Sequence, residues 1–312
     1  MALNPATDWF DPRRGALAGL EPGAAGDLAA RMPRIIAKAR DAAGSLVHGA
    51  HGRRRAGTGE TFWQYRPFAS GESGQRIDWR RSARGDQLFV REHEWEAAIN
   101  HFLWIDLSPG MAFKSALAQD YKIDRAATLG LALADVLVRG GERVGALGLS
   151  TPIAARNVTQ RLAQVFSEAA QAAARAEKLP PEAALPPRAK LLLVSDFFCD
   201  VEALAARLSA FAGAGARGAL LMVLDPAEEV FPFAGETLFL DPAGGDPFHA
   251  GDARLLQSRY VEKLAEHREA LRAAARKAGF LFLQHHTDRP ASEAALALLM
   301  GLAEGAEGRA WA

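Results

Sequence analysis

The stretch HFLWIDLS, residues 101–108, is a short apolar run that ends on an aspartate and a serine. Similar runs follow it along the chain, and amphipathic stretches of helical length separate them. These runs are RVGALGLS (143–150), KLLLVSD (190–196), GALLMVLD (218–225) and GFLFLQHH (279–286). Near-continuous apolar strands that alternate with helices are typical of a parallel sheet covered on both faces. The sequence therefore predicts an α/β fold with a doubly wound, mostly parallel sheet.

The segments between these strands have the spacing of amphipathic helices. Helices are expected at 121–139, 158–176, 200–213, 254–277 and 291–303. The run STPIAAR, residues 150–156, directly follows the second strand and predicts an antiparallel edge strand. The strands at 101–108 and 190–196 are expected near the centre of the sheet.

The chain before the first of these strands has a different composition. Residues 1–44 begin rich in Pro and Gly and then show helical spacing from Met32 to Ala43. Residues 45–98 are rich in Gly, Arg and aromatic residues, in short runs such as ETFWQYRPF and QLFVREHEW. Short runs punctuated by turn residues predict strands of a small β-rich module. We therefore expect an N-terminal helical segment over 1–44, a β module over 45–98 and an α/β domain over 99–312.

Composition limits the classes of function. The chain has 312 residues with 37 Lys and Arg against 37 Asp and Glu, so its formal net charge is zero. This balance argues against a dedicated nucleic-acid binder, whose affinity for phosphates comes from excess Lys and Arg. The single cysteine, Cys199, excludes an internal disulfide framework and a cysteine-based zinc site. Without a long apolar stretch or a signal-peptide layout, a soluble cytoplasmic protein is expected.

Polar residues at the carboxyl ends of the predicted strands are the candidate functional residues. Ligands of a doubly wound sheet collect in the crevice at this edge. Asp106 and Ser108 end the first strand on the same side, and Ser195 and Asp196 end the strand at 190–196. Carboxylate and hydroxyl oxygens placed in this way suit Mg²⁺. The alternative is that Asp106 and Asp196 are ordinary N-caps of the helices that follow them.

Residues 57–97, GTGETFWQYRPFASGESGQRIDWRRSARGDQLFVREHEWEA, carry the most specific pattern of the chain. Its elements are Arg66, Arg76-Ile77-Asp78-Trp79, Ser82-Ala83-Arg84, Val90-Arg91-Glu92 and the later Asp106-x-Ser108. This pattern resembles the hallmark of the family called domain of unknown function 58, and the resemblance extends over essentially the whole chain after residue 30. It implies a von Willebrand factor A-like sheet joined to a β-rich module. Members of the family are often encoded beside MoxR-type AAA+ ATPases.

The resemblance implies that the strand-end crevice corresponds to a metal-ion-dependent adhesion site. Such a site has the pattern Asp-x-Ser-x-Ser and is completed by a distant Thr and Asp. Asp106 and Ser108 match its first positions, and Asp196 matches the later Asp-bearing loop. Gly110 stands at the third position and has no hydroxyl, while Thr159 is a candidate for the Thr. The predicted metal ligands are Asp106, Ser108 and Asp196 of a degenerate site, where Mg²⁺ would bind weakly or not at all.

The expected function is that of a non-enzymatic protein-interaction protein. The resemblance implies a MoxR-type AAA+ ATPase as its partner, in the assembly or maturation of a client protein. One alternative is a Mg²⁺-dependent phosphoryl-transfer hydrolase with Asp106 as nucleophile and Asp196 holding the ion. Haloacid-dehalogenase-type enzymes of that layout want Asp-x-Asp, and Ser108 stands at the second position here.

A second alternative is a nucleic-acid-binding module built on the arginines of the β module. The stretch 53–91 contains nine Arg and no Lys. Carboxylates interleaved with these arginines balance most of their charge, which favours an internal network. We therefore expect Asp78 and Glu92 to engage Arg side chains and Trp79 to be buried. The arginines are Arg53, Arg54, Arg55, Arg66, Arg76, Arg80, Arg81, Arg84 and Arg91.

Overall fold

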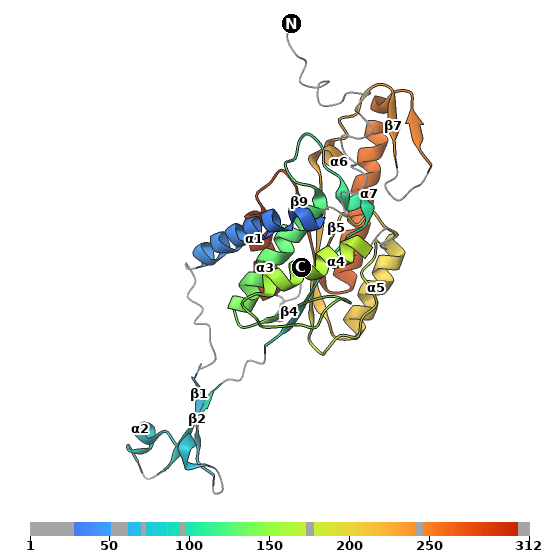
Figure 1. Cartoon of the computed structure of the whole chain (residues 1–312). Helices are drawn as coiled ribbons and strands as arrows, with labels where there is room; N and C mark the ends of the chain where they lie inside the picture. The colour runs from blue at the N-terminus through green and yellow to red at the C-terminus, as the bar shows by residue number, and fades with distance from the viewer. Residues whose placement is uncertain are drawn as a thin grey trace. The chain divides into compact units, whose positions relative to one another are not determined.

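The computed structural model describes residues 28–50, 62–69, 73–85, 87–93, 98–172, 178–240 and 246–304. The chain divides into two compact units, of which the larger joins Met1–Gly52 to Ile99–Ala312 and the smaller is Arg53–Ala98. The larger unit is built on a five-stranded parallel sheet with helices on both faces (Figure 1). This arrangement confirms the α/β class that the alternation of strands and helices predicts.

The sheet has the strand order β4-β3-β5-β6-β9, and all neighbouring strands are parallel. Its strands are β3 (Asn100–Ile105), β4 (Arg143–Ala146), β5 (Lys190–Ser195), β6 (Arg217–Leu224) and β9 (Phe280–His286). The predicted strands are therefore confirmed, and β5 lies at the centre. The expected antiparallel edge strand is reduced to one bridge between Val144 and Ile153. Pro152 has no N–H to extend that pairing into a ladder.

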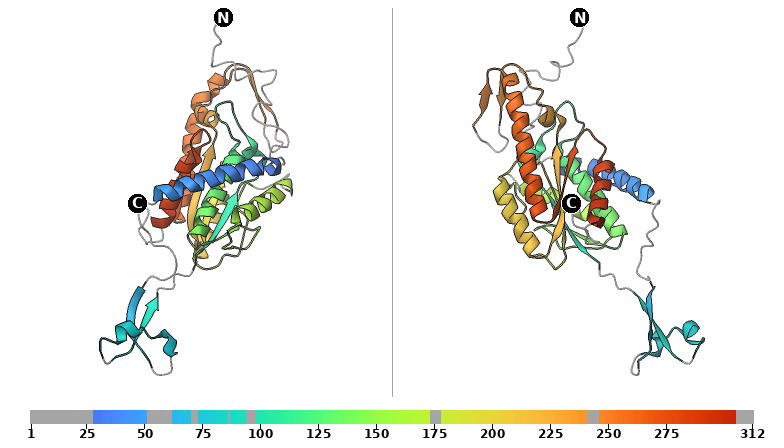
Figure 2. Two further views of the ribbon diagram at one scale, coloured as in Figure 1. Left: turned by 60° about the vertical axis from the view of Figure 1, so that its left-hand side comes forward. Right: turned by 180° about the vertical axis from the view of Figure 1, so that it is seen from behind.

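Successive residues of a strand enter opposite cores, because their side chains alternate across the sheet. Leu103 and Ile105 of β3 pack with α3, α4 and α8, whereas Phe102 and Trp104 pack with α5 and α7 on the other face. Figure 2 shows helices on both faces of the sheet. The helices are α3 (Lys122–Arg139), α4 (Val158–Ala172), α5 (Val201–Gly213), α7 (Gln257–Lys277) and α8 (Ala291–Glu304). Residues 173–176 of the helix predicted at 158–176 lie outside the described residues. Two covered faces explain why the strands are apolar throughout.

Helix α1 (Leu28–Ala50) packs on α3, α4 and α8 with a stripe of buried apolar residues. Its Arg31 side chain binds both carboxylate oxygens of Asp124 in α3, at 2.8 and 3.0 Å from Nε. The helix begins before Met32 and continues beyond residue 44, into the segment predicted as β-rich. The apolar stripe extends from Leu28 to Leu46, so packing on α3 carries the helix past Gly44.

The smaller unit contains an antiparallel pair of strands, β1 (Phe62–Pro67) and β2 (Phe89–His93). A short 3-10 helix, η1 (Gly74–Arg76), and α2 (Trp79–Ser82) lie in the connection between them. Val90 is fully buried and forms a bridge with Ile77, so this pair supplies the apolar centre of the described part. The expected burial of Trp79 is wrong, because its side chain is 64% exposed at the start of α2.

Two charged residues among the described residues of this unit, Asp78 and Arg81, make backbone and ring contacts. Asp78 caps α2 by accepting a hydrogen bond from the backbone N–H of Arg81 at 3.0 Å, rather than from a guanidinium. The Arg81 guanidinium lies 5.3 Å from the ring centre of Tyr65 and 5.4 Å from that of Phe89. The side chain of Glu92 lies outside the described residues, as do Arg53, Arg54 and Arg55.

A second antiparallel pair of strands, β7 (Thr237–Phe239) and β8 (Phe248–Ala250), follows α6 (Pro226–Val230). Phe231 and Phe233 pack against Phe239 and hold this ribbon beside the start of α7, where Tyr260 joins the cluster. Within the described ranges, none of the helices combines the length and apolar composition needed to cross a bilayer.

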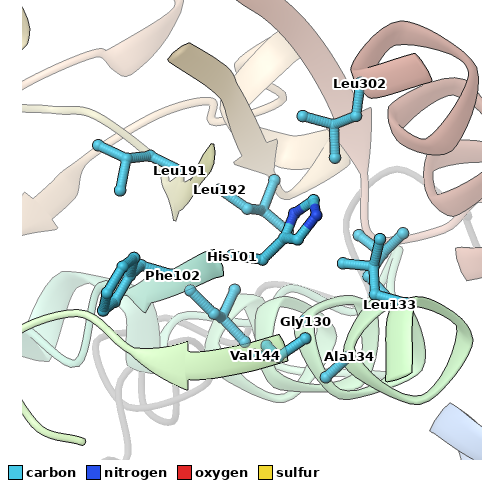
Figure 3. A pocket seen from close by; sticks show the side chains of 11 residues that line it. His101, Phe102, Gly130, Leu133, Ala134, Val144, Leu191, Leu192 and Leu302 are labelled. Atoms are coloured by element: carbon cyan, nitrogen blue, oxygen red, sulfur yellow. The ribbon is translucent and has the colours of Figure 1, made fainter. Parts of the chain in front are cut away.

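His101 lies beside a small apolar cavity of about 10 Å³ on the α3 face of the sheet. Figure 3 shows its imidazole among aliphatic side chains of β4, β5, α3 and α8, including Val144, Leu192 and Leu302. Burial, and then the charge of Lys190 on β5, lower the pKa of His101 to about 4. The imidazole is therefore neutral in the folded protein at neutral pH.

We expect His101 to make folding stability depend on pH below neutrality. An unfolded His titrates near pH 6.5, so the unfolded state binds more protons between pH 6.5 and about 4. The contribution of neutral His101 to the free energy of unfolding is therefore fully present above pH 6.5. It falls as the pH decreases through this window, by up to about 3 kcal/mol. Urea unfolding at several pH values measures the slope, which His101→Leu should reduce. His249→Leu, at an exposed His, is the control; equal slopes for wild type and His101→Leu would contradict the expectation.

Candidate functional site

Three neighbouring strands, β3, β5 and β6, each lead into an aspartate at the carboxyl edge of the sheet. The aspartates are Asp106, Asp196 and Asp225, and each is 2% exposed or less. The pairing of β3 with β5 places the first two on adjacent strand ends, and the Asp106 N–H donates to the Val194 carbonyl at 2.9 Å. The strand-end positions predicted for Asp106 and Asp196 are therefore side by side in the fold.

Asp106 joins the ends of β3 and β5 through both of its carboxylate oxygens. Oδ1 accepts a hydrogen bond from the Ser108 N–H at 2.8 Å, and Oδ2 accepts one from Ser195 Oγ at 2.7 Å. Ser195 Oγ in turn accepts from the Phe197 N–H at 2.9 Å. Burial, and then the negative charge of Asp196, raise the pKa of Asp106. The two carboxylates are thus close enough to influence each other.

Asp196 is bound by a buried lysine. Lys122 Nζ lies 2.8 Å from Asp196 Oδ2 and 2.6 Å from Glu228 Oε1. Lys122 is the first residue of α3 and is 1% exposed. Asp196 Oδ1 accepts from the Phe198 N–H at 3.0 Å, and Glu228 Oε2 accepts from the Asp225 N–H at 2.8 Å. The ammonium therefore links the end of β5 to α6, which follows β6.

The positive charge of Lys122 and the negative charges of Asp196 and Glu228 stabilise one another. Burial acts against the ammonium, but Asp196 and Glu228 outweigh it and raise the pKa of Lys122. Burial also acts against the Asp196 carboxylate, but Lys122 and the Phe198 N–H hold the pKa of Asp196 below its usual value. Burial raises the pKa of Glu228, an effect that Lys122 partly offsets. Lys122 and Asp196 therefore form an ionised pair at neutral pH.

Asp225 fixes the loop that leads into Lys122. Its carboxylate accepts hydrogen bonds from the Ser115 N–H at 2.9 Å, from Ser115 Oγ, and from the Ala227 N–H at 2.9 Å. Ser115 lies between η2 (Pro109–Ala112) and α3. The end of β6 therefore holds the loop that directs Lys122 toward Asp196.

The helix-cap alternative for the two predicted aspartates is wrong. The N-cap of α5 is Asp200, whose side chain accepts from the Ala203 N–H, and Tyr121 stands at the N-cap of α3. Ser108 takes the corresponding position of η2. Asp106 and Asp196 bind Ser195 and Lys122 instead, so they belong to one polar cluster at the sheet edge.

The other residues of the predicted metal site are only partly assembled. Ser108 Oγ is buried and has no hydrogen-bond partner in the part of the chain that the structure describes. A Cβ at Gly110 would lie 3.6 Å from Asp196 Oδ2 and 3.9 Å from Lys178 Nζ, so Gly110 does stand beside Asp196. Thr159 is buried in α4, and no hydrogen bond connects it to Asp106 or Asp196 among the described residues.

This donor set does not fit a divalent cation as it stands. Asp106 and Ser108 offer oxygen atoms of the kind that Mg²⁺ prefers. Both carboxylate oxygens of Asp196, however, already have partners: Oδ1 accepts from the Phe198 N–H and Oδ2 binds the Lys122 ammonium. Lys178 Nζ also lies nearby. Positive groups at this distance repel a further cation. Across the described residues, no group of three or more His, Cys, Asp or Glu is placed to hold a metal ion. The metal site remains a prediction, and Lys122 is the observation against it.

Lys122, Glu228 and Asp225 belong to the polar cluster but are not among the site residues that the sequence predicts. A lysine at the first position of a helix opposes the helix macrodipole, so Lys122 was a detectable anomaly. Asp225 and Glu228 form a capping box at α6, which their spacing also indicates. No local pattern shows that this box approaches α3, because that contact forms only when the sheet is assembled.

Comparisons with known proteins place the whole arrangement in a family. The family model described as "Protein of unknown function DUF58" matches residues 64–270. "Uncharacterized protein Rv1480" of Mycobacterium tuberculosis H37Rv and "Uncharacterized protein Mb1516" of Mycobacterium bovis are each 24% identical over 281 residues, covering 84% of this chain and 86% of the relative.

Two solved structures with some similarity come from Bacteroides species. One is an aerotolerance-related membrane protein of Bacteroides fragilis, with 13% identity and a TM-score of 0.35. The other is BatB of Bacteroides thetaiotaomicron, with 12% identity and a TM-score of 0.35. Each comparison covers 66% of this chain and 100% of the other. The family match at residues 64–270 includes the polar cluster and most of the β module, so the chain belongs to the family "Protein of unknown function DUF58".

Proposed function

We propose that the protein is a non-enzymatic interaction protein that receives an acidic side chain of a partner at the carboxyl edge of its sheet. The partner is a MoxR-type AAA+ ATPase, with which the protein acts in the assembly or maturation of other proteins. The choice of partner rests on the family resemblance, and the choice of edge rests on the polar cluster around Asp196.

The observation that carries this proposal is the ammonium of Lys178. Its Nζ would lie 3.9 Å from a Cβ at Gly110, next to the Asp196 carboxylate. Lys178 is half-buried and makes no ion pair within 4 Å in the described part of the chain. A half-buried positive group with unused donors at this edge of the sheet can receive a carboxylate from outside. Lys178 is thus placed to attract a carboxylate of the partner to this edge of the sheet.

Exposed apolar side chains at the same edge support a protein partner. Leu117, Leu149 and Val230 are 46%, 50% and 51% exposed. They follow the carboxyl ends of β3, β4 and β6, so they lie in the segments that surround the polar cluster. Protein interfaces combine such apolar contacts with a few charged groups that set orientation.

The phosphoryl-transfer alternative needs a nucleophile that a substrate can reach. Asp106 is fully buried, and both of its carboxylate oxygens accept hydrogen bonds from Ser108 and Ser195. This geometry suits a structural link between strand ends and supports the interaction proposal over the hydrolase.

We expect charge reversal at Lys178 to weaken partner binding. With the purified MoxR-type ATPase of the source organism, Lys178→Glu should raise Kd about tenfold or more, equivalent to about 1.4 kcal/mol. Lys178→Gln should cause a smaller loss, because it removes attraction without adding repulsion. Titration calorimetry measures both, and unchanged melting temperatures confirm that the variants are folded.

Lys277→Glu is the matched control for this experiment. Lys277 is exposed near the end of α7, just before β9 begins, so it lies at the opposite edge of the sheet. Its reversal should leave the affinity unchanged. Equal losses for Lys178→Glu and Lys277→Glu would show that net charge, not the crevice, drives binding and would overturn the proposal.

A further inference from the structure

Lys122 is the most unusual side chain of the carboxyl edge. Lysine is almost never fully buried unless it is paired, and here it is 1% exposed between the carboxylates of Asp196 and Glu228. Both oxygen atoms lie within 2.8 Å of Nζ. The ammonium is thus placed as a cation shared by two carboxylates that come from different strand ends.

The surroundings of the ammonium suit an organic cation. Lys122 Nζ lies 5.4 Å from the ring centre of Phe198 and 5.7 Å from that of Phe113. Aromatic faces attract an ammonium group through the ring quadrupole. Mg²⁺ instead retains several water molecules, which need polar partners rather than aromatic rings. The position between Asp196 and Glu228 is therefore better matched to Lys122 than to a hydrated metal ion.

The groups around Lys122 show what this edge of the sheet would be without the ammonium. Asp106 lies on the strand end next to Asp196, and the two carboxylates influence each other electrostatically. Ser108 Oγ is buried nearby on the β3 side and has no hydrogen-bond partner among the described residues. Without this ammonium, the carboxylates of Asp196 and Glu228 would face each other with no cation between them. Two facing carboxylates offer oxygen atoms of the kind that a divalent cation prefers.

We infer that the Lys122 ammonium is the resident cation of this strand-end site and takes the place of the metal ion that the family resemblance implies. The side chain belongs to α3, so one positive charge lies between Asp196 and Glu228 in every copy of the protein without any metal. The inference concerns the crevice of the proposed function but does not rest on its partner, so the two proposals can fail separately.

Binding of Mn²⁺ to the purified full-length chain tests this inference, with Mn²⁺ as a spectroscopic substitute for Mg²⁺. Wild type should show no site in electron paramagnetic resonance titrations at millimolar Mn²⁺, and EDTA should not change its melting temperature. Lys122→Met should bind Mn²⁺ at least tenfold more tightly than wild type, and Mn²⁺ should raise its melting temperature. Lys122→Arg keeps the positive charge and should bind no Mn²⁺.

A double variant shows whether the gained site is the one described. Lys122→Met combined with Asp196→Asn removes a ligand together with the lysine, so it should lose the gained Mn²⁺ affinity. The inference is overturned if wild type binds Mn²⁺ in a manner that Asp196→Asn abolishes, a result that does not require Lys122→Met to fold. It is also overturned if folded Lys122→Met binds Mn²⁺ no better than Lys122→Arg.

Discussion

Replacing Lys122 with methionine should lower the free energy of unfolding by about 3–5 kcal/mol at neutral pH, because it leaves buried carboxylates without their counter-charge. Methionine is close in length to lysine, so the change removes the charge with little loss of packing. Asp196 is 2% exposed, so bulk solvent reaches its carboxylate poorly. Urea unfolding followed by circular dichroism measures the effect.

The pH dependence of this loss identifies its cause. In the wild type the pKa of Asp196 is held low, so its contribution to stability is present above its ordinary pKa of 3.8 and is lost as the pH falls below that value. In Lys122→Met the orphaned carboxyl groups can take up protons at mildly acidic pH. The difference between wild type and variant should therefore shrink as the pH falls from 7 toward 4.

Lys263→Met is the matched control for Lys122→Met. Lys263 also pairs with a carboxylate, Glu266 at 2.7 Å, but both side chains are more than half exposed on α7. Exposed ion pairs contribute about 1 kcal/mol or less. Similar losses for the two variants would contradict the assignment of Lys122 as a buried counter-charge.

The sheet and its carboxyl edge could be predicted because they depend on local patterns. Apolar runs such as residues 190–196 show a strand covered on both faces, and the parallel connection of such strands brings their carboxyl ends together. Asp106 and Asp196 could therefore be placed on neighbouring strand ends before their contacts were seen. The long sequence separation of Asp106 and Asp196 did not prevent this prediction, because the fold class itself indicates that their strands lie near the centre of the sheet.

The occupant of the site could not be predicted, because it depends on contacts between distant segments. Lys122 reaches Asp196 and Glu228 only when α3 and α6 are both packed at the same edge. The family resemblance instead implies a metal ion at this position. A similar limit applies to Trp79, whose burial was expected from its type. In the described part of the smaller unit, Ile77 and Val90 fill the apolar centre beside the β1–β2 pair and leave Trp79 outside.

Replacing Gly218 with alanine should leave little folded protein, with a loss of about 4 kcal/mol or more. Gly218 pairs with Leu191 where β6 lies against β5. A Cβ at Gly218 would lie 1.8 Å from the Leu191 carbonyl oxygen and 2.7 Å from its carbonyl carbon. These are backbone atoms of the central strand, so they cannot move aside without breaking the β5–β6 pairing. Soluble yield and the thermal melt report the effect.

Gly213→Ala separates this steric effect from the general cost of losing a glycine. Gly213 ends α5, and a Cβ there would meet nothing within 4 Å. Alanine also has a higher helix propensity than glycine, so this variant should be neutral or more stable by up to about 1 kcal/mol. Because β5 and β6 lead into Asp196 and Asp225, separating these strands would also dismantle the polar cluster. A Gly218→Ala protein that melts like wild type would contradict the close β5–β6 contact on which the cluster depends.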